Sequence, residues 1–382
     1  MSDPRRAQLG AAFHRQFGWA PTLWARAPGR VDLMGSHTDY NQGFVLTLPI
    51  DRDTWIAARP SGDRRVRLYS LNLDEAAEFG LDEPAASTRG FGRYVQGVAV
   101  ILGDEGYPLH GFDAVVHSTM PLRSGLSSSA ALEAATALVL AQLGGYAVEP
   151  VRLAKLCQRA ENEIVGVKCG ILDQYSSILG RAGSAVVLDC RQLTHRIAPL
   201  PADLHVVICN TCAPRELTGS EYGERRAQCE DAARRLGVAY LREVRIEQFT
   251  RRERELPPVV ARRSRFIIEE SERVERLAQA LTQNDRAAIG RLTAASYAGA
   301  RDLFEIGAPA MDAMQRAMTS APGVIGARQA GAGFGGCLVA FVHAPDLEAF
   351  VAQVHQQYAA ESGLTPEVYP VCAANGAEVL PA

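Results

Sequence analysis

A turn rich in glycine and serine, at residues 121–129, joins two segments with different secondary-structure preferences. The segment 112–117 before it is typical of a strand, and the Ala-, Leu- and Val-rich segment 129–143 after it is typical of a helix. A strand that enters a helix through such a turn exposes the helix N-terminus, whose N–H groups lack partners and whose dipole attracts anions. Gly125 allows close approach to the backbone, and the serine hydroxyls can bond phosphate oxygens or a metal ion. The segment therefore predicts a phosphate-binding turn, with an ordinary serine N-cap as the alternative.

Strands and helices are mixed along the whole chain. Expected strands lie at 24–27, 44–50, 54–58, 65–69, 112–117, 184–188, 204–208, 337–342 and 367–370, with a turn at 51–53. Expected helices lie at 93–102, 129–143, 151–165, 221–236, 262–282, 286–297, 308–319 and 347–360. Because the order lacks strict βαβ alternation, an α+β fold is favoured over a doubly wound parallel sheet. The length of 382 residues predicts two domains, which we place at 1–200 and 201–382.

Composition and charge exclude several classes of protein. The 40 basic and 43 acidic residues give a net charge of −3, so nothing global attracts nucleic acid or an acidic membrane surface. No apolar run approaches the roughly 20 residues of a membrane span, and residues 1–12 lack the apolar core of a signal peptide. We expect a cytoplasmic protein with reduced cysteines. The pair Cys209 and Cys212 has no second pair at zinc-ligand spacing, so we expect ordinary thiols there.

A glycine loop at residues 331–336 formally satisfies the pattern G-x-G-x-x-G. A dinucleotide-binding site needs a helix after this pattern, whereas the segment 337–342 is typical of a strand. The chain also lacks a Walker A sequence and the H-R-D and D-F-G segments of protein kinases. The loop therefore predicts a glycine turn at which the backbone approaches something closely, or a hairpin packed against another element.

Residues 27–41 concentrate a cation, a histidine, carboxylates, hydroxyls and an amide between two expected strands. Such a density of polar groups is typical of a site for a polyhydroxylated ligand, because every buried hydroxyl needs hydrogen-bonding partners. A polar surface loop is the alternative. Two further acids, Glu161 in an expected helix and Asp173 after a glycine-rich turn, are twelve positions apart. A helix cap is the alternative role for Asp173.

These motifs, in this order, resemble those of the superfamily of galactokinase, homoserine kinase, mevalonate kinase and phosphomevalonate kinase, the GHMP kinases. The segment 29–41, Gly-Arg-Val-Asp-Leu-Met-Gly-Ser-His-Thr-Asp-Tyr-Asn, is similar to the signature of the galactokinase family, as are 169–174, 219–226 and 301–306. The resemblance covers nearly the whole chain. It implies a two-domain α+β fold, with an N-terminal domain like domain 2 of ribosomal protein S5 and a ferredoxin-like C-terminal domain. It also implies an ATP-dependent sugar 1-kinase that acts on galactose.

The same resemblance implies a role for individual residues. Asp173 would accept the proton of the anomeric hydroxyl, and Arg30 would stabilise the transferring phosphoryl group. The residues implied to contact the sugar are Ser36, His37, Thr38, Asp39 and Tyr222. Those implied to bind ATP are Arg123, Ser124, Gly125, Leu126, Ser127, Ser128 and Ser129, and those implied to hold Mg²⁺ are Ser129 and Glu161. A monomer whose ligands are the sugar and ATP is expected.

The chain departs from the family pattern at three places. Most galactokinases have Glu in place of Ser36, Asn in place of Asp32, and Met-Thr-Gly-Gly-Gly where residues 329–333 are Gln-Ala-Gly-Ala-Gly. The resemblance implies that the family's Glu contacts the C6 hydroxyl of the sugar. Three substrates therefore stay open: galactose with a looser C6 end, L-arabinose, which lacks C6, and galacturonate, whose carboxylate a Glu would repel. A non-catalytic sugar sensor is a fourth hypothesis, against which the intact residues 127–131, Arg30 and Asp173 argue.

Overall fold

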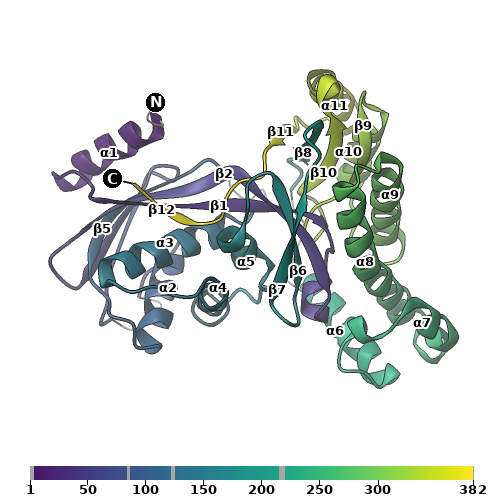
Figure 1. Ribbon diagram of the computed structural model, residues 1–382, viewed down its shortest axis with the longest axis horizontal. Helices are drawn as coiled ribbons and strands as arrows, with labels where there is room; N and C mark the ends of the chain where they lie inside the picture. Colours follow the sequence, from purple (N-terminus) through teal and green to yellow (C-terminus); the bar gives the residue numbers. More distant parts are fainter. Residues whose placement is uncertain (1–3, 84–86, 122–124, 215–219, 382) are drawn as a thin grey trace. The chain divides into compact units, whose positions relative to one another are not determined.

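The computed structural model describes residues 4–83, 87–121, 125–214 and 220–381, and its helices and strands form the expected α+β fold (Figure 1). The chain divides into two compact units. Unit 1 comprises Met1–Arg30, Pro49–Gly180 and Ala374–Ala382, and unit 2 comprises Val31–Leu48 and Arg181–Ala373. These units differ from two continuous halves that meet at residue 200. The difference arises because two long strands continue from one unit into the other and the last strand pairs with the first.

Unit 1 is built on a mixed sheet with the strand order β12-β1-β2-β5-β3-β4. The strand β5 runs antiparallel to β2 and parallel to β3, and β12 runs antiparallel to β1. The bounds of these strands are β1 Leu23–Met34, β2 Phe44–Pro60, β3 Arg65–Ser70, β4 Glu75–Gly80, β5 Phe112–Ser118 and β12 Glu378–Leu380.

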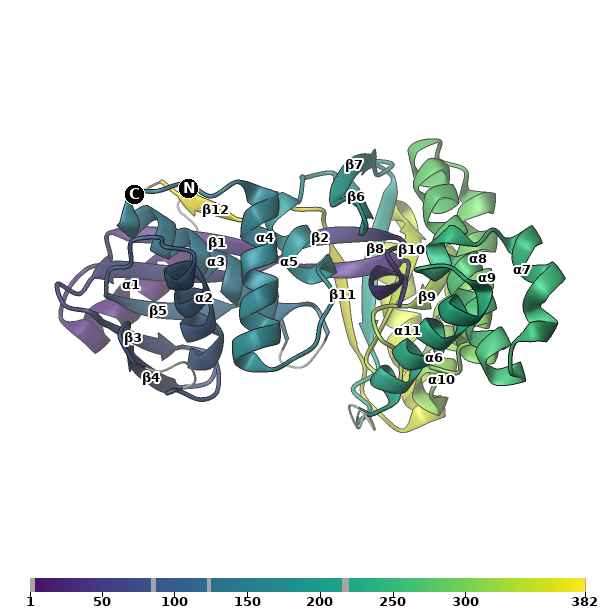
Figure 2. The ribbon, with the colours of Figure 1, turned by 90° about the horizontal axis from the view of Figure 1, so that it is seen from below.

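Helices cover both faces of this sheet (Figures 1 and 2). One face carries α1, whose Leu9 and Phe13 pack with Trp24, Trp55 and Val115 of the strands. The other helices, α2 to α5, lie along the opposite face. Their bounds are α1 Pro4–Phe17, α2 Gly92–Asp104, α3 Ser128–Gly144, α4 Pro150–Arg159 and α5 Leu172–Leu179, and a π-helical segment, Ala160–Val165, follows α4. The helix α3 is buried on almost every side, as its nearly uniform Ala, Leu and Val content requires.

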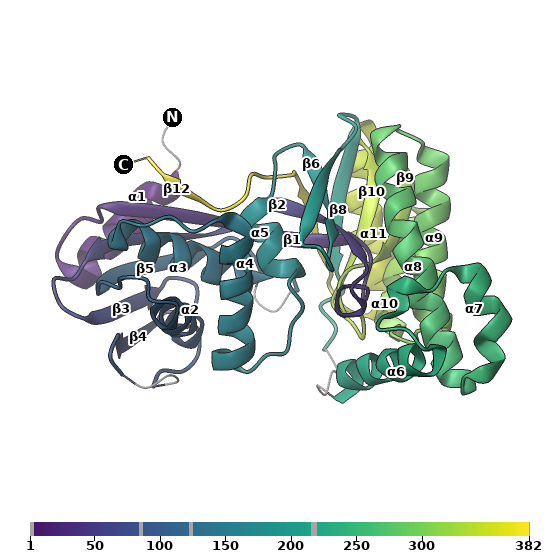
Figure 3. The same ribbon diagram turned by 60° about the horizontal axis from the view of Figure 1, so that its bottom comes forward.

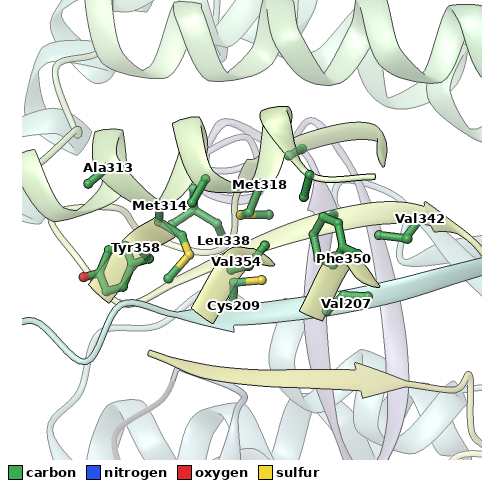
Figure 4. Close-up of a cluster of buried hydrophobic side chains, with 14 of the residues drawn as sticks. Val207, Cys209, Ala313, Met314, Met318, Leu338, Val342, Phe350, Val354 and Tyr358 are labelled. Atoms are coloured by element: carbon green, nitrogen blue, oxygen red, sulfur yellow. The ribbon is translucent and has the colours of Figure 1, made fainter. Parts of the chain in front are cut away.

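Unit 2 contains an antiparallel four-stranded sheet with the order β11-β8-β10-β9. The helices α10 and α11 pack on it through a core that includes Val207, Met314, Leu338, Phe350 and Val354 (Figure 4). The hairpin of β6 and β7 pairs with the first residues of β2. The strand bounds are β6 Ser184–Asp189, β7 Thr194–Pro199, β8 Leu204–Asn210, β9 Val324–Gln329, β10 Cys337–His343 and β11 Glu367–Val371.

Two long helices, α8 and α9, lie side by side in unit 2, with α6 and α7 near one end of α8 (Figure 3). Phe249, Phe266 and Phe304 form the centre of a second core among these helices. The helix bounds are α6 Ser220–Leu236, α7 Ile246–Arg252, α8 Pro258–Thr282, α9 Arg286–Asp302, α10 Pro309–Ser320 and α11 Leu347–Ser362. Short 3₁₀ turns occur at Asp39–Asn41, Leu241–Glu243, Glu253–Glu255 and Ala344–Asp346. Within the described ranges, no helix has both the length and the apolar character needed to cross a membrane.

The structure corrects three sequence-based expectations. The strand β1 continues to Met34, so Arg30 and Asp32 lie in a strand rather than in a loop between strands. The expected turn at 51–53 is wrong, because β2 is continuous and the buried carboxylate of Asp53 is paired with Arg5 and Arg26. The expected helix 151–165 changes at Ala160 from α-helical to π-helical geometry.

Candidate active site

A partly buried ion pair joins β1 to the start of α5 in unit 1. The guanidinium of Arg30 donates two hydrogen bonds to Oδ1 of Asp173, from Nε at 2.8 Å and from Nη2 at 2.5 Å. A third bond runs from Nη1 of Arg30 to the carbonyl oxygen of Gly125, at 2.8 Å. The Arg30 side chain is 10% exposed and that of Asp173 is 25% exposed, so the carboxylate lies at the solvent edge of the pair. Arg30 and Asp173, to which the resemblance gave separate catalytic roles, are thus in direct contact.

The position of Asp173 follows from the packing of α5. Leu172 and Tyr175 are buried in unit 1, and the Ser177 hydroxyl donates to the carbonyl oxygen of Pro28 on β1 at 2.7 Å. The N-cap residue of α5 is Ile171, and no side chain caps the helix there. Asp173 is therefore not a helix cap, and its carboxylate is turned to Arg30 instead.

The predicted phosphate-binding turn is described from Gly125 onward, and the predicted ATP ligands Arg123 and Ser124 lie outside the described residues. Leu126 is buried, and its carbonyl oxygen accepts a hydrogen bond from the backbone N–H of Arg30 at 3.1 Å. Ser127 adopts φ +62°, which is unusual for a residue with a side chain. The helix α3 begins directly after it, at Ser128. The turn therefore holds a strained backbone against β1 at the N-terminus of a buried helix.

Two features of this turn point to a ligand. The Ser127 hydroxyl is buried, and in the described part of the chain it has no hydrogen-bonding partner. A pocket that is partly open to solvent is lined by Ser128 and Ser129 at the start of α3. Its other lining residues are Thr54, Ser70, Asn72, Leu73, Phe91, Tyr94, Val116, Ser118, Met120 and Leu132. Sequence reasoning did not identify these residues, because they come from several strands and helices and form no local motif.

A cluster of acids lies behind the turn. The hydroxyl of Ser129 is hydrogen bonded to the carboxylate of Glu161, whose pKa is raised by burial and further by Asp173. Burial, reinforced by Glu161, also holds the pKa of Glu133 well above its usual range. Over the described ranges, no group of three His, Cys, Asp or Glu side chains is arranged to bind a metal ion. A hydroxyl and one carboxylate nevertheless fit Mg²⁺, which is commonly bound by one or two carboxylates together with substrate phosphates and water.

The segment predicted to contact the sugar is a tight loop in unit 2. His37 has φ +65°, and its ring packs against those of Tyr222 and Phe304. Burial lowers the pKa of His37 to about 4, so the ring is neutral at pH 7. Its Nε2 lies 3.0 Å from the carbonyl oxygen of Ala332 and must carry the proton, so that Nδ1 accepts from the Tyr40 hydroxyl at 3.0 Å. The loop is thus tied to the glycine loop through one histidine tautomer.

The other residues predicted to contact the sugar differ in exposure. Thr38 is fully buried, and its hydroxyl lies 2.7 Å from the carbonyl oxygen of Gly35 and 2.6 Å from that of Phe44. Asp39 and Tyr222 have partly exposed side chains. The loop therefore uses Thr38 to maintain its own fold and leaves Asp39 within reach of a ligand, and Tyr222 of α6 is similarly accessible.

Ser36 belongs to a buried ionic network. Its hydroxyl donates to Oδ2 of Asp32 at 2.7 Å and accepts from Nη2 of Arg328 at 2.8 Å. Arg328 is completely buried, and it also donates to Oε1 of Glu270 at 3.1 Å and to the hydroxyl of Ser296 at 3.0 Å. Sequence reasoning missed Arg328, Glu270 and Ser296, because they are far from Ser36 along the chain.

The glycine loop 331–336 closes the β9–β10 hairpin, where the N–H of Ala330 bonds the carbonyl oxygen of Cys337. Gly333 has φ +83°, and a Cβ atom there would lie 2.6 Å from the carbonyl oxygen of Ile306. The loop is therefore a hairpin turn, and its backbone also approaches that of Ile306 closely, so both structures that its sequence allowed are present.

Comparison with known proteins first identifies the class of protein to which this chain belongs. A model of the N-terminal domain of GHMP kinases matches residues 93–181, and one of the C-terminal domain matches residues 277–360. The mevalonate kinase fold is similar, with a TM-score of 0.66 at 17% identity over 93% of this chain and 100% of that one. The fold is that of a GHMP kinase, as the sequence predicted.

Proteins with higher sequence identity to this chain identify the family within this class. The model of the galactokinase galactose-binding signature matches residues 11–60. Galactokinase of Roseiflexus sp. strain RS-1 is 40% identical over 97% of this chain and 96% of its own, and that of Chloroflexus aurantiacus is 41% identical over 93% of each. The structure of Lactococcus lactis galactokinase complexed with galactose has a TM-score of 0.93, at 34% identity, over 98% of this chain and 99% of that one. The chain belongs to the galactokinase family.

Proposed function

We propose that this protein is an ATP-dependent galactokinase, which transfers the γ-phosphoryl group of ATP to the anomeric oxygen of D-galactose. The observation that carries the proposal is the Arg30–Asp173 pair, which is bonded to Gly125 of the phosphate-binding turn. A carboxylate and a guanidinium fixed beside such a turn suit phosphoryl transfer, which depends on positioning and on neutralising charge.

In this proposal Asp173 is the general base and Arg30 is the electrostatic catalyst. Both side-chain bonds from Arg30 go to Oδ1 of Asp173, so Oδ2 can accept the proton of the anomeric hydroxyl. The anomeric oxygen then forms a bond to the γ-phosphorus while the bond to the bridging oxygen breaks and ADP leaves. The guanidinium stabilises the negative charge on the transferring group.

ATP is proposed to bind at the N-terminus of α3. The N–H groups of residues 125–129 and the unpartnered Ser127 hydroxyl offer hydrogen bonds to phosphate oxygens. The neighbouring pocket, with the aromatic rings of Phe91 and Tyr94, suits the adenine base. Ser129 and Glu161 would hold Mg²⁺, which neutralises phosphate charge when it is bound.

The sugar is proposed to bind at residues 36–39 and Tyr222. Asp39 and Tyr222 are partly exposed and provide polar atoms for sugar hydroxyls, whereas Ser36, His37 and Thr38 hold the loop in shape through their buried bonds. We further propose that the enzyme is a monomer and that it is cytoplasmic, a compartment in which its eight free cysteines would stay reduced.

The test is ADP release in the presence of Mg²⁺ and ATP, with galactose, L-arabinose and galacturonate compared by kcat/KM. We expect galactose to be the best substrate. A tenfold higher kcat/KM for L-arabinose or galacturonate would show that this sugar, and not galactose, is the substrate. Sugar binding without turnover of any of the three would support a sensor instead.

A further inference from the structure

A chain of hydrogen bonds runs behind the proposed metal ligands of unit 1. The side-chain amide of Gln174 donates from Nε2 to Oε2 of Glu133 at 3.0 Å and to Oε2 of Glu161 at 2.6 Å. The Glu161 carboxylate is also bonded by the Ser129 hydroxyl and, at 3.2 Å, by the Cys169 thiol. One buried amide therefore links the two glutamates.

The elements that carry these residues fix their arrangement. Ser129 and Glu133 are four residues apart on α3, so they lie on the same face of that helix. Glu161 comes from the π-helical segment, a geometry often found at functional sites, and Gln174 comes from the first turn of α5. Gln174 and Glu133 are completely buried. The amide thus connects α3, the π-helix and α5 in a region without solvent.

The orientation of the amide is determined by its partners. An amide nitrogen has two hydrogens, and here each one is directed to a glutamate oxygen. The reversed amide would place an oxygen against the Glu161 carboxylate, which already accepts bonds from Ser129 and Cys169, and this contact would be repulsive. Glu133 touches no proposed ligand of ATP or sugar through these bonds, so its contribution to the site passes through Gln174.

We propose that Glu133 and Gln174 are positioning residues, which hold the Glu161 carboxylate against Ser129. The Ser129 hydroxyl oxygen and a carboxylate oxygen of Glu161 are then placed to bind a divalent cation. The proposal rests on the assignment of Ser129 and Glu161 as metal ligands under the proposed function. Groups that orient metal ligands typically change metal affinity by about 10- to 100-fold when they are removed.

The experiment measures binding of Mn²⁺ in the presence of ADP, from the loss of the free-ion electron paramagnetic resonance signal. Glu133→Leu removes the acceptor that holds Gln174, and Gln174→Leu removes the amide itself. We expect either variant to weaken Mn²⁺ binding about tenfold, with galactose affinity by calorimetry unchanged. Glu133→Gln keeps an acceptor oxygen at the same place and should bind Mn²⁺ within twofold of the parent protein.

Thr136→Val is the matched control. Thr136 is as buried as Glu133 on the same helix, and its hydroxyl has no partner in the part of the chain that the structure describes. This variant should bind Mn²⁺ as the parent does, and circular dichroism verifies the fold of every variant. If Glu133→Leu fails to fold, Gln174→Leu decides the question by the same measurement.

The variant Glu161→Gln distinguishes a failure of the positioning role from a failure of the metal-ligand assignment. If that variant loses Mn²⁺ while Glu133→Leu and Gln174→Leu bind it normally, the positioning role is wrong and the metal site stands. If Glu161→Gln binds Mn²⁺ as the parent does, the ligand assignment under the proposed function is itself wrong. Equal weakening in Glu133→Leu and Glu133→Gln would also overturn the positioning role, because an acceptor oxygen would then be insufficient.

Discussion

The guanidinium of Arg328 donates to the hydroxyl of Ser36 at 2.8 Å, at a position where neither side chain is open to solvent. The same network contains one further arginine, Arg273, which is bonded to Oε2 of Glu270. The buried carboxylates of Asp32 and Glu270 pair with these two arginines, and Arg273 also pairs with the partly exposed Glu269. Ser36 is thus the neutral member of a network whose two arginines already have carboxylate partners.

Ser36→Glu should therefore destabilise the protein strongly. The new carboxylate would enter a site beside Asp32 that is 3% exposed, and no additional cation would compensate its charge. Burial of an unpaired charge, with the added volume, predicts a loss of about 3 kcal/mol in the free energy of unfolding. Urea denaturation at pH 7 measures this change.

The double variant Asp32→Asn with Ser36→Glu tests the charge argument directly. It moves the carboxylate from position 32 to position 36 and restores the balance with Arg328 and Arg273. We expect it to recover at least half of the stability lost in Ser36→Glu alone. If the changes in unfolding free energy of Asp32→Asn and Ser36→Glu simply add, the volume of the side chain at position 36, and not its charge, causes the destabilisation.

Asp173→Asn should abolish most of the catalysis with little effect on the fold. The amide oxygen can still accept bonds from Arg30, but the side chain can no longer take a proton from the sugar. Loss of a general base predicts a decrease in kcat of about 100-fold or more, while KM for galactose stays within about threefold of the parent value. Steady-state kinetics measures both, and an unchanged kcat would mean that Asp173 only positions the sugar.

The proposed site residues Arg30 and 125–129 could be selected from the sequence because their signals are local. Arg30 and residues 125–129 stand in short motifs, and the strand, turn and helix around the second motif follow from side-chain periodicity. The Arg328 network could not be predicted, because it joins residues 32, 36, 270, 296 and 328 through tertiary packing alone. The continuity of β2 was missed for the same reason, since Asp53 is acceptable in a strand only where Arg5 and Arg26 meet it.

The low pKa of His37 makes the stability depend on pH. Burial lowers this pKa to about 4 in the folded protein, below the ordinary value of 6.5 in the unfolded chain. The contribution to stability is therefore complete above pH 6.5 and is lost as the pH falls toward 4, because only the unfolded state takes up the proton. The shift corresponds to about 3 kcal/mol.

Urea denaturation between pH 7 and pH 4 tests this dependence. The parent protein should lose stability relative to His37→Asn as the pH decreases, whereas His14→Asn, at an exposed histidine of α1, should follow the parent. Parallel curves for the parent and His37→Asn would contradict the neutral, buried state of His37.

Gly333→Ala should destabilise the glycine loop and weaken the hold on His37. The backbone has φ +83°, which costs a residue with a Cβ about 1–2 kcal/mol. The new Cβ would also lie 2.6 Å from the carbonyl oxygen of Ile306, so the turn must move.

Gly331→Ala is the matched control, since its φ is +78° and a Cβ there meets no atom within 4 Å. We expect Gly333→Ala to lose at least about 1 kcal/mol more than Gly331→Ala in urea denaturation and to raise KM for galactose, because the neighbouring Ala332 carbonyl orients His37. Equal losses in the two variants would show that φ alone requires glycine in this loop and that the contact with Ile306 is easily relieved.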